Sequence, residues 1–151
     1  MILIYRPTTT RDEEFLYQLH RATMRTYVEE TWGMWDEDWQ QTYFHQHFIP
    51  EDLLILQLDG VDIGVISVQE RTEELFLGIV QILPSYQRQG IGTTVIRDLL
   101  TRAARQGKPV ALKVLKSNRL ARSLYQRLGF GVTGETATHY VMAWMKGLSI
   151  E

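Results

Sequence analysis

The feature that most constrains the fold of this chain is the segment QRQGIG at residues 87–92. It follows the apolar run ELFLGIVQIL, residues 74–83, which is typical of a strand, and precedes a run with apolar residues at helical spacing. A helix that begins here leaves its first backbone N–H groups without intrahelical partners, at the positive end of the helix dipole. Gly90 and Gly92 let an anion approach the backbone, and Arg88 adds a positive charge. The segment predicts a strand, an anion-binding turn and a helix.

Two common phosphate-binding motifs do not fit this turn. A Walker loop requires Gly-Lys-Ser/Thr, whereas Gly92 is followed by Thr93 and Thr94. A dinucleotide fingerprint requires a third glycine where this chain has Val95. An NTPase and a nicotinamide enzyme are therefore disfavoured. Another phosphate-bearing ligand and a plain tight turn remain as interpretations.

The rest of the chain predicts a mixed α/β domain. Thr10 and Glu13 form a candidate capping box for a first helix, which Gly33 interrupts, and Asp59-Gly60 is a hairpin signal. We expect the order β-α-α-β-β-β-α-β-α-β-β, with the strand in 74–83 central and covered on both faces. The expected later elements are a helix over 90–105, a strand over 110–116, a helix over 118–128 and strands over 130–135 and 139–145.

Composition narrows the classes of function. At 151 residues we expect one domain, residues 1–151. The absence of cysteine excludes disulfides, thiolate zinc sites and a cysteine nucleophile. No apolar run reaches the ~20 residues of a membrane helix, and the beginning lacks a secretory pattern, so we expect a cytoplasmic protein without membrane contact.

The charges divide strongly along the chain. Residues 1–80 carry 5 Lys/Arg and 15 Asp/Glu, a net charge of −10, whereas residues 81–151 carry 11 and 3, a net charge of +8. This division suggests partners of opposite sign for the two halves, or an unevenly charged solvated surface. The negative net charge and the lack of an aromatic-basic pattern disfavour nucleic acid as a partner.

Two motifs together resemble the GNAT superfamily of N-acetyltransferases. QRQGIG fits that family's pattern Gln/Arg-x-x-Gly-x-Gly/Ala, and Asn118 followed by ARSLYQRLGF is similar to its helix after the fifth strand. The resemblance is close over residues 75–145. It implies a splayed mixed sheet of six to seven strands flanked by about four helices, with acetyl-CoA between the fourth and fifth strands.

The resemblance also implies which residues bind the cofactor. The backbone of Ile82 and Leu83 would pair with the pantetheine arm, and Asn118 would line the same cleft. The pyrophosphate would be wrapped by the loop after the strand, namely Gln87, Arg88, Gln89, Gly90, Ile91, Gly92 and Thr93.

Tyr125 is the candidate general acid. It lies seven residues after Asn118, so at about 100° per residue both side chains share one helix face. A tyrosine with a pKa of about 10 keeps its proton at neutral pH and can protonate a leaving thiolate. The resemblance assigns Tyr125 this role. The alternatives are that Tyr125 packs in the core and that Asn118 only caps its helix.

The sequence identifies the general base less clearly than the general acid. Some family members place a glutamate on the fourth strand, but the aligned residue here is Phe76. His139 on the last strand is the candidate, because an imidazole with a pKa of about 6.5 accepts protons at physiological pH. A half-buried histidine that bonds across the sheet, and a water chain, are alternatives. His45 and His47 are two apart on a predicted helix and make a poor metal pair, so we expect no metal.

The segment EETWGMWDEDW, residues 29–39, is the candidate acceptor region. It combines tryptophans and carboxylates, which suit a cationic amine. We expect contacts from Glu29, Trp32 or Trp35, with helix packing and capping as the alternative for this segment.

The sequence therefore predicts an acetyl-CoA-dependent N-acetyltransferase that acts directly on a primary amine, of a small cationic metabolite. A protein or peptide N-acetyltransferase and a non-catalytic acyl-CoA-binding module are the alternatives. The oligomeric state stays open, a homodimer included.

Overall fold

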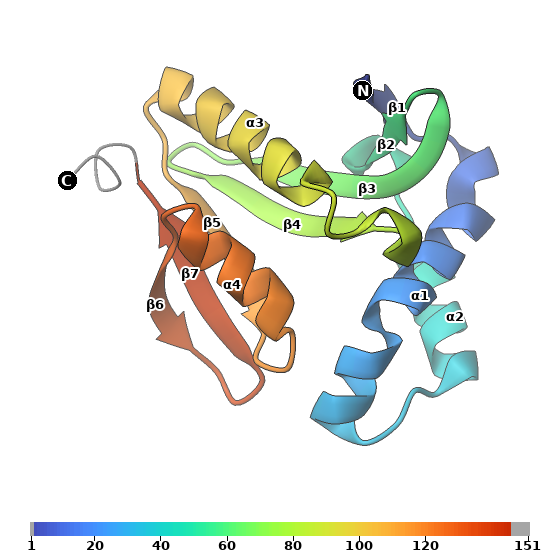
Figure 1. Ribbon diagram of the computed structural model, residues 1–151. Coiled ribbons are helices and arrows are strands. Elements are labelled where there is room, and N and C mark those ends of the chain that lie inside the picture. The colour runs from blue at the N-terminus through green and yellow to red at the C-terminus, as the bar shows by residue number, and fades with distance from the viewer. Residues whose placement is uncertain (1, 146–151) are drawn as a thin grey trace. The chain divides into compact units, whose positions relative to one another are not determined.

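The computed structural model describes residues 2–145 and has the expected order of elements (Figure 1). The strands are β1 (Leu3–Pro7), β2 (Leu54–Leu58), β3 (Val61–Glu70), β4 (Leu75–Ile82), β5 (Val110–Leu115), β6 (Gly131–Glu135) and β7 (His139–Trp144). The helices are α1 (Glu13–Trp32), α2 (Glu37–His47), α3 (Ile91–Gln106) and α4 (Arg119–Arg127). Three short 3-10 turns were not anticipated: η1 (Thr10–Asp12), η2 (Pro50–Asp52) and η3 (Pro84–Tyr86).

The strands of the described chain form one seven-stranded sheet in the order β1-β2-β3-β4-β5-β7-β6. β4 is therefore the central strand, as predicted. β4 pairs with β5 in parallel, but only Leu75–Leu77 face Val110–Leu112 although both strands continue further. The predicted mixed, splayed sheet with about four flanking helices is thus confirmed.

The chain divides into two compact units, which are described separately. The first, here the N-terminal unit, contains residues 2–67 and 79–87 of the described chain, and the C-terminal unit contains residues 68–78 and 88–145. The single domain expected over residues 1–151 stays a prediction.

In the N-terminal unit, α1 packs on the β2–β3 hairpin. Leu16 and Leu19 of α1 are buried against Ile55 and Val65. The hairpin turn has positive φ at Asp59 (50°) and Gly60 (83°), as the Asp-Gly signal predicted.

The predicted capping box is wrong by one residue. Thr9 and Asp12 form the box, because the 3-10 turn η1 begins the helical segment before α1. Asp12 also accepts hydrogen bonds from the Arg6 guanidinium, at 3.0 and 2.8 Å, which ties this turn to β1. Thr10 and Glu13 therefore do not carry the capping role that their spacing suggested.

A close approach in the N-terminal unit fixes the end of β4. A Cβ on Gly64 of β3 would lie 2.4 Å from the carbonyl oxygen of Gln81, so only glycine fits there. The prediction that β4 is covered on both faces is wrong, because Phe76, on the face opposite Leu75 and Leu77, is only partly buried. Leu75 and Leu77 are buried, whereas Ile79 is 39% exposed, since it lines a pocket.

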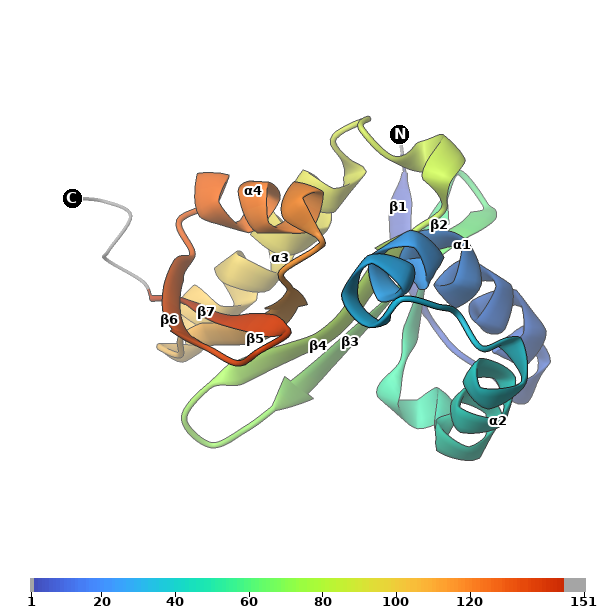
Figure 2. The same cartoon turned by 90° about the horizontal axis from the view of Figure 1, so that it is seen from below.

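In the C-terminal unit, β5, β7 and β6 lie side by side (Figure 2). β7 pairs antiparallel with both β5 and β6. α3 buries an apolar stripe that includes Ile91, Val95 and Leu99, and it ends at Gly107 with φ of 66°, as predicted.

Candidate functional site

The N-terminus of α3 is open, whereas side chains cap the N-termini of α2 and α4. Gly90 takes the N-cap position with φ of 82°, and within the described chain no side chain caps this helix. The first turn contains no acidic residue, and the first helical bond runs from Thr94 N to Gly90 O at 3.1 Å. By contrast, the Asp36 carboxylate caps α2. The N–H groups of Ile91 to Thr93 therefore have no intrahelical partner and suit an anion.

The loop before α3 is held in an unusual backbone conformation. Arg88 has φ of 63°, in the left-handed region that few non-glycine residues adopt. Strained backbone conformations of this kind cluster at ligand-binding sites, so this conformation is compatible with a loop that binds a ligand. Gln89 has an interaction of its own, so only its position in the loop supports a role.

The end of β4 offers one of the two expected backbone positions. The Leu83 N–H donates to the Ile63 carbonyl oxygen at 2.8 Å, so it is already used within the N-terminal unit. Because successive residues of a strand point to opposite sides, the backbone N–H and C=O of Ile82 point away from β3. The Gln87 side chain donates to the Ile82 carbonyl oxygen at 2.8 Å. Of the expected pantetheine partners, Ile82 therefore fits better than Leu83.

Asn118 and Tyr125 both lie where the helical spacing predicted. The Asn118 side chain accepts from Ala121 N at 3.2 Å, so it caps α4. Tyr125 is 6% exposed and packs on Phe130, with ring centroids 5.5 Å apart. Burial raises the pKa of Tyr125 to about 12.

The Tyr125 hydroxyl is available to a ligand. Among the described residues it has no hydrogen-bond partner. It is also not completely buried, because in this part of the chain the Thr8 hydroxyl is the only side-chain atom that is both completely buried and unpaired. Tyr125 thus combines a packed ring with an accessible hydroxyl, so core packing and a chemical role are compatible.

His139 begins β7, beside Leu115 of β5. Its Nδ1 lies 2.7 Å from the Thr138 hydroxyl oxygen, which is a local contact rather than a bond across the sheet. Partial burial, and then the charge of Lys113, lower the pKa of His139 below its usual 6.5. The imidazole is therefore neutral at physiological pH and able to accept a proton.

The three expected acceptor residues have different surroundings. Trp35 is 7% exposed, and its indole N–H donates to Glu37 at 2.6 Å. Tyr17 of α1 donates to the same carboxylate at 3.0 Å, so Trp35 belongs to the link between α1 and α2. Glu29 pairs with Arg25 at 3.6 Å, and Trp32 is 57% exposed. None of the three lines the pocket described next.

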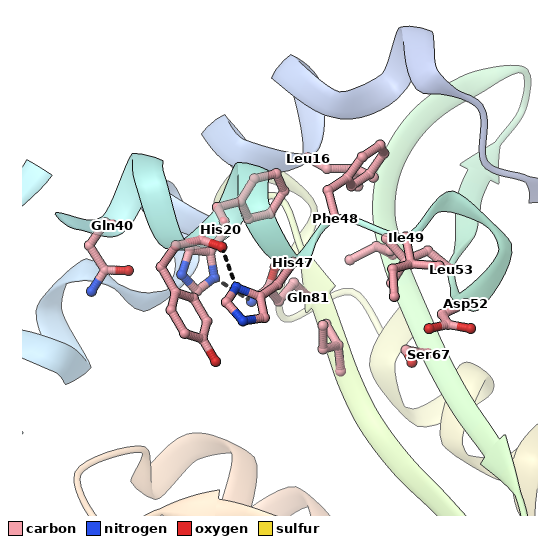
Figure 3. A pocket seen from close by; sticks show the side chains of 14 residues that line it. Leu16, His20, Gln40, His47, Phe48, Ile49, Asp52, Leu53, Ser67 and Gln81 are labelled. Carbon is pink, nitrogen blue, oxygen red and sulfur yellow. Dashed lines mark hydrogen bonds between the residues drawn. The ribbon is translucent and has the colours of Figure 1, made fainter. Parts of the chain in front are cut away.

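His20, which lies within α1, is a site residue that was not predicted from the sequence. Figure 3 shows His20 beside Gln81 of β4 at one end of a pocket in the N-terminal unit, with the two side chains 3.1 Å apart. Burial lowers the pKa of His20, so the ring is neutral at physiological pH. No motif marks His20, and the only available signal was its place on the apolar face of α1, four residues after Leu16.

The family model for the acetyltransferase (GNAT) family matches residues 14–130. The chain belongs to this family. The resemblance seen in the sequence, and the class of acyltransferase with it, are thereby confirmed. Among curated proteins, no relative of the chain was found.

Solved GNAT structures share the fold at low sequence identity. PaiA N-acetyltransferase of Thermoplasma acidophilum, in complex with coenzyme A, has a TM-score of 0.77 at 19% identity, with 96% of this chain and 99% of that chain covered. The ribosomal-protein-S18-alanine N-acetyltransferase of Escherichia coli has a TM-score of 0.67 at 21% identity, with 95% and 94% covered. These likenesses concern the fold.

Residues 2–145 contain no group of three or more His, Asp or Glu side chains placed to hold a metal ion. None of the helices there is both long and apolar enough to cross a membrane.

Proposed function

We propose that this GNAT protein transfers the acetyl group of acetyl-CoA directly to the primary amine of a small cationic metabolite. The open, acid-free N-terminus of α3, in a chain of the acetyltransferase family, is the observation that carries the proposal. Coenzyme A supplies the activated acyl group as a thioester. The uncapped N–H groups fit its pyrophosphate, because they are donors that the protein itself leaves unused.

The proposal assigns each cofactor residue a role. The loop Gln87–Thr93 binds the pyrophosphate, with Arg88 as the cation beside it. Ile82 offers its outward backbone groups to the pantetheine amides, with Leu83 next to it, and Asn118 both caps α4 and lines the cofactor site.

Tyr125 donates a hydrogen bond, and then its proton, to the leaving sulfur as the C–S bond breaks. With a pKa near 12 it keeps its proton at rest. A thiol in water has a pKa of about 8.5, so full transfer is uphill unless the thiolate is desolvated as well. The burial that raises the pKa of Tyr125 acts on a neighbouring thiolate in the same direction.

His139 accepts the proton that the attacking amine must lose. Its lowered pKa keeps it neutral at pH 7, and this supports the role. No residue forms an acetyl-enzyme through a thiol, since the chain has no cysteine.

The acidic N-terminal half supports a cationic acceptor. Glu29 and Trp32 are its exposed candidates, whereas the buried Trp35 would act by holding α2 in place. The alternative acceptor is a protein N-terminus, because one fold neighbour is named for acetylating a ribosomal alanine. Preference for peptides over free amines in a thiol-release assay would favour that alternative.

The test compares Tyr125→Phe with Tyr140→Phe. Tyr140 lies on β7 in the same unit, where its ring contacts Arg122 at 5.0 Å. In an assay of thiol release from acetyl-CoA over a panel of amines, Tyr125→Phe should lower kcat by about 10²-fold with the Kd for acetyl-CoA unchanged. Tyr140→Phe should leave kcat within about twofold. Tight acetyl-CoA binding without thiol release for any amine or peptide would instead indicate a non-catalytic acyl-CoA-binding module.

A further inference from the structure

The pocket in the N-terminal unit is large enough for a ligand smaller than a drug molecule. Its volume is about 260 Å³, below the range of roughly 300–1,000 Å³ for drug-sized ligands. It lies between the end of α2, the segment after it and the faces of β3 and β4 (Figure 3). Gln81, at one end, directly precedes Ile82 in the chain, so this end is next to the backbone assigned to the cofactor.

The wall from α2 is aromatic. Trp39, Tyr43 and His47 stack along the helix at four-residue spacing, with ring centroids 5.0 and 4.0 Å apart and ring planes within 21°. The His47 ring is fixed further by a hydrogen bond from Nδ1 to the Tyr43 carbonyl oxygen, 2.8 Å long. Tyr43 and His47 line the pocket, whereas Trp39 does not.

The remaining walls are mostly apolar and carry little charge. Phe44 and Phe48 stack with centroids 6.0 Å apart, and Ile79 adds an exposed apolar side chain from β4. Among the described residues that line the pocket, Asp52 is the single carboxylate, and neither lysine nor arginine occurs. Asp52 is exposed and lies at the opposite end from His20 and Gln81, so the rest of the pocket offers no carboxylate to an ammonium group. A ligand with two or more ammonium groups, or with a carboxylate, would leave a charge unpaired.

Polar groups lie at both ends of the pocket. His20 and Gln81 form one end, while Ser67 and Asp52 lie at the other (Figure 3). Ser67 is 9% exposed, and its hydroxyl has no hydrogen-bond partner within the described chain. It is not among the completely buried, unsatisfied side-chain atoms of the described chain, so it is open to the pocket and can bond a ligand or water there.

We propose that this pocket binds the acyl acceptor and that the acceptor is a monoamine with a ring-bearing, apolar body. The proposal rests on the function proposed above, names its substrate class, and replaces the contacts of the acceptor with Glu29 and Trp32, neither of which lines the pocket. The amine nitrogen lies, as the neutral base that attacks the thioester, at the His20–Gln81 end next to Ile82, and the body lies along Tyr43 and Phe44. A hydrogen-bonding group on the far side of the ring reaches the Ser67 hydroxyl.

The experiment compares tyramine, 2-phenylethylamine and spermidine as acceptors. Thiol release should give a kcat/KM for tyramine at least tenfold above that for spermidine, because spermidine brings additional ammonium groups into an apolar pocket with one carboxylate. 2-Phenylethylamine should fall between them. Ser67→Ala should remove the advantage of tyramine over 2-phenylethylamine and leave the value for 2-phenylethylamine unchanged. Higher kcat/KM for spermidine than for both aromatic amines would overturn the proposal.

Two variants test the location independently of turnover. Ile79→Trp fills the pocket from a partly exposed strand position and should weaken tyramine binding at least tenfold in calorimetry with CoA present. Trp39→Ala removes a ring of the same stack that does not line the pocket, and should change tyramine binding less than twofold. Both variants should keep the wild-type Kd for acetyl-CoA, which reports folding.

The binding measurement separates this proposal from the proposed function. If tyramine binds, Ile79→Trp abolishes this binding and no thiol is released, the result would support the ligand site in the pocket and contradict the proposed acetyltransferase function. Thiol release from other amines, with tyramine neither bound nor acetylated, would do the opposite.

Discussion

The N-terminus of α3 and the pocket beside α2, the two ligand sites that we propose, differ in the groups that line them. At α3 the donors are backbone N–H groups, exposed because Gly90 caps the helix without a side chain. At the pocket, the walls are side chains from α1, α2, β3 and β4, which are far apart in the sequence. The first is a local device within one short segment. The second exists only after distant elements have packed.

This difference explains why one ligand is easier to infer than the other. A backbone site for phosphate needs glycines, a strand before it and a helix after it, all within one stretch of sequence. A side-chain site needs a cavity of suitable shape and charge. The sequence does not tell which apolar residues of α2 face that cavity. The charges follow the same division, with a net +8 in residues 81–151 and −10 in residues 1–80.

The largest expected effect concerns which unit supplies the base. Each unit has a histidine with a lowered pKa, His139 in the C-terminal unit and His20 in the N-terminal unit. His139→Gln should lower kcat/KM by about 10²-fold at pH 7.5. In the wild type, activity should fall as the pH drops through the lowered pKa of His139, below 6.5, because the base then becomes protonated.

His20→Gln is the matched comparison for that pH profile. It should raise KM for the amine and keep the acidic limb of kcat, since His20 contacts the acceptor in our proposal. If His20→Gln abolishes the acidic limb and His139→Gln preserves it, the base belongs to the N-terminal unit instead.

The next effect separates stability from binding at α3. Thr93→Glu places a carboxylate in the first turn, where the helix dipole should stabilise the free protein by about 0.3–1 kcal/mol. The same charge repels a pyrophosphate, so the Kd for acetyl-CoA should rise at least about tenfold, or 1.4 kcal/mol. Thermal unfolding and calorimetry measure the two.

Thr101→Glu is the control on the same helix, at an exposed position beyond the first turn. It should leave the affinity for acetyl-CoA within about twofold. Equal losses of affinity for Thr93→Glu and Thr101→Glu would mean that the α3 N-terminus is not where the phosphates bind.

The smallest effect compares the acid sensitivity of the two units. In the N-terminal unit, Arg6 bonds both Asp12 and Asp62 at 2.8 Å and holds the pKa of each carboxyl below its usual value. Their contribution to stability is therefore present above the usual pKa of about 3.9 and is lost as the pH falls through the lowered values. Asp62→Asn should cost about 1–2 kcal/mol at pH 7 and progressively less towards pH 3.

Glu135→Gln in the C-terminal unit is the matched control. Its partner is Lys116 at 2.6 Å, but the Glu135 side chain is 59% exposed. Solvent screens such a pair, so the change should cost less than about 0.5 kcal/mol at any pH. Unfolding curves from pH 7 to pH 3 would contradict this contrast if both variants lost the same stability.

Much of the fold was predictable because its signals are local. Gly33, Asp59-Gly60 and Gly107 end or turn their elements with positive φ, and Asn118 caps α4 as its position suggested. The shift of the first capping box from Thr10 to Thr9 has a tertiary cause. Asp12 is also bound by Arg6 of β1, and no local pattern contains that contact.

The candidate site was likewise predictable only where its residues lie in one contiguous segment. Tyr125 and Asn118 share one helix, so their spacing in the sequence indicates a common face. Three hydrogen bonds could not be predicted, because the sequence separates their residues or gives no reason to pair them. They join the Leu83 N–H to the Ile63 carbonyl oxygen, the Trp35 indole to Glu37, and His20 to Gln81.

The sequence by itself determined the order of the elements, the central strand and the glycine turn that opens α3 at Gly90. Helix and strand periods, turn residues and a backbone site are properties of contiguous segments, and so they can be read from one. Only the tertiary structure decided that Trp35 is a packing residue, that Ile79 is exposed on the central strand, and that Tyr43, Ser67 and His20 surround one pocket. Burial and unpaired hydrogen-bonding groups are set by elements from distant parts of the chain, and in our proposal such groups recognise the acceptor.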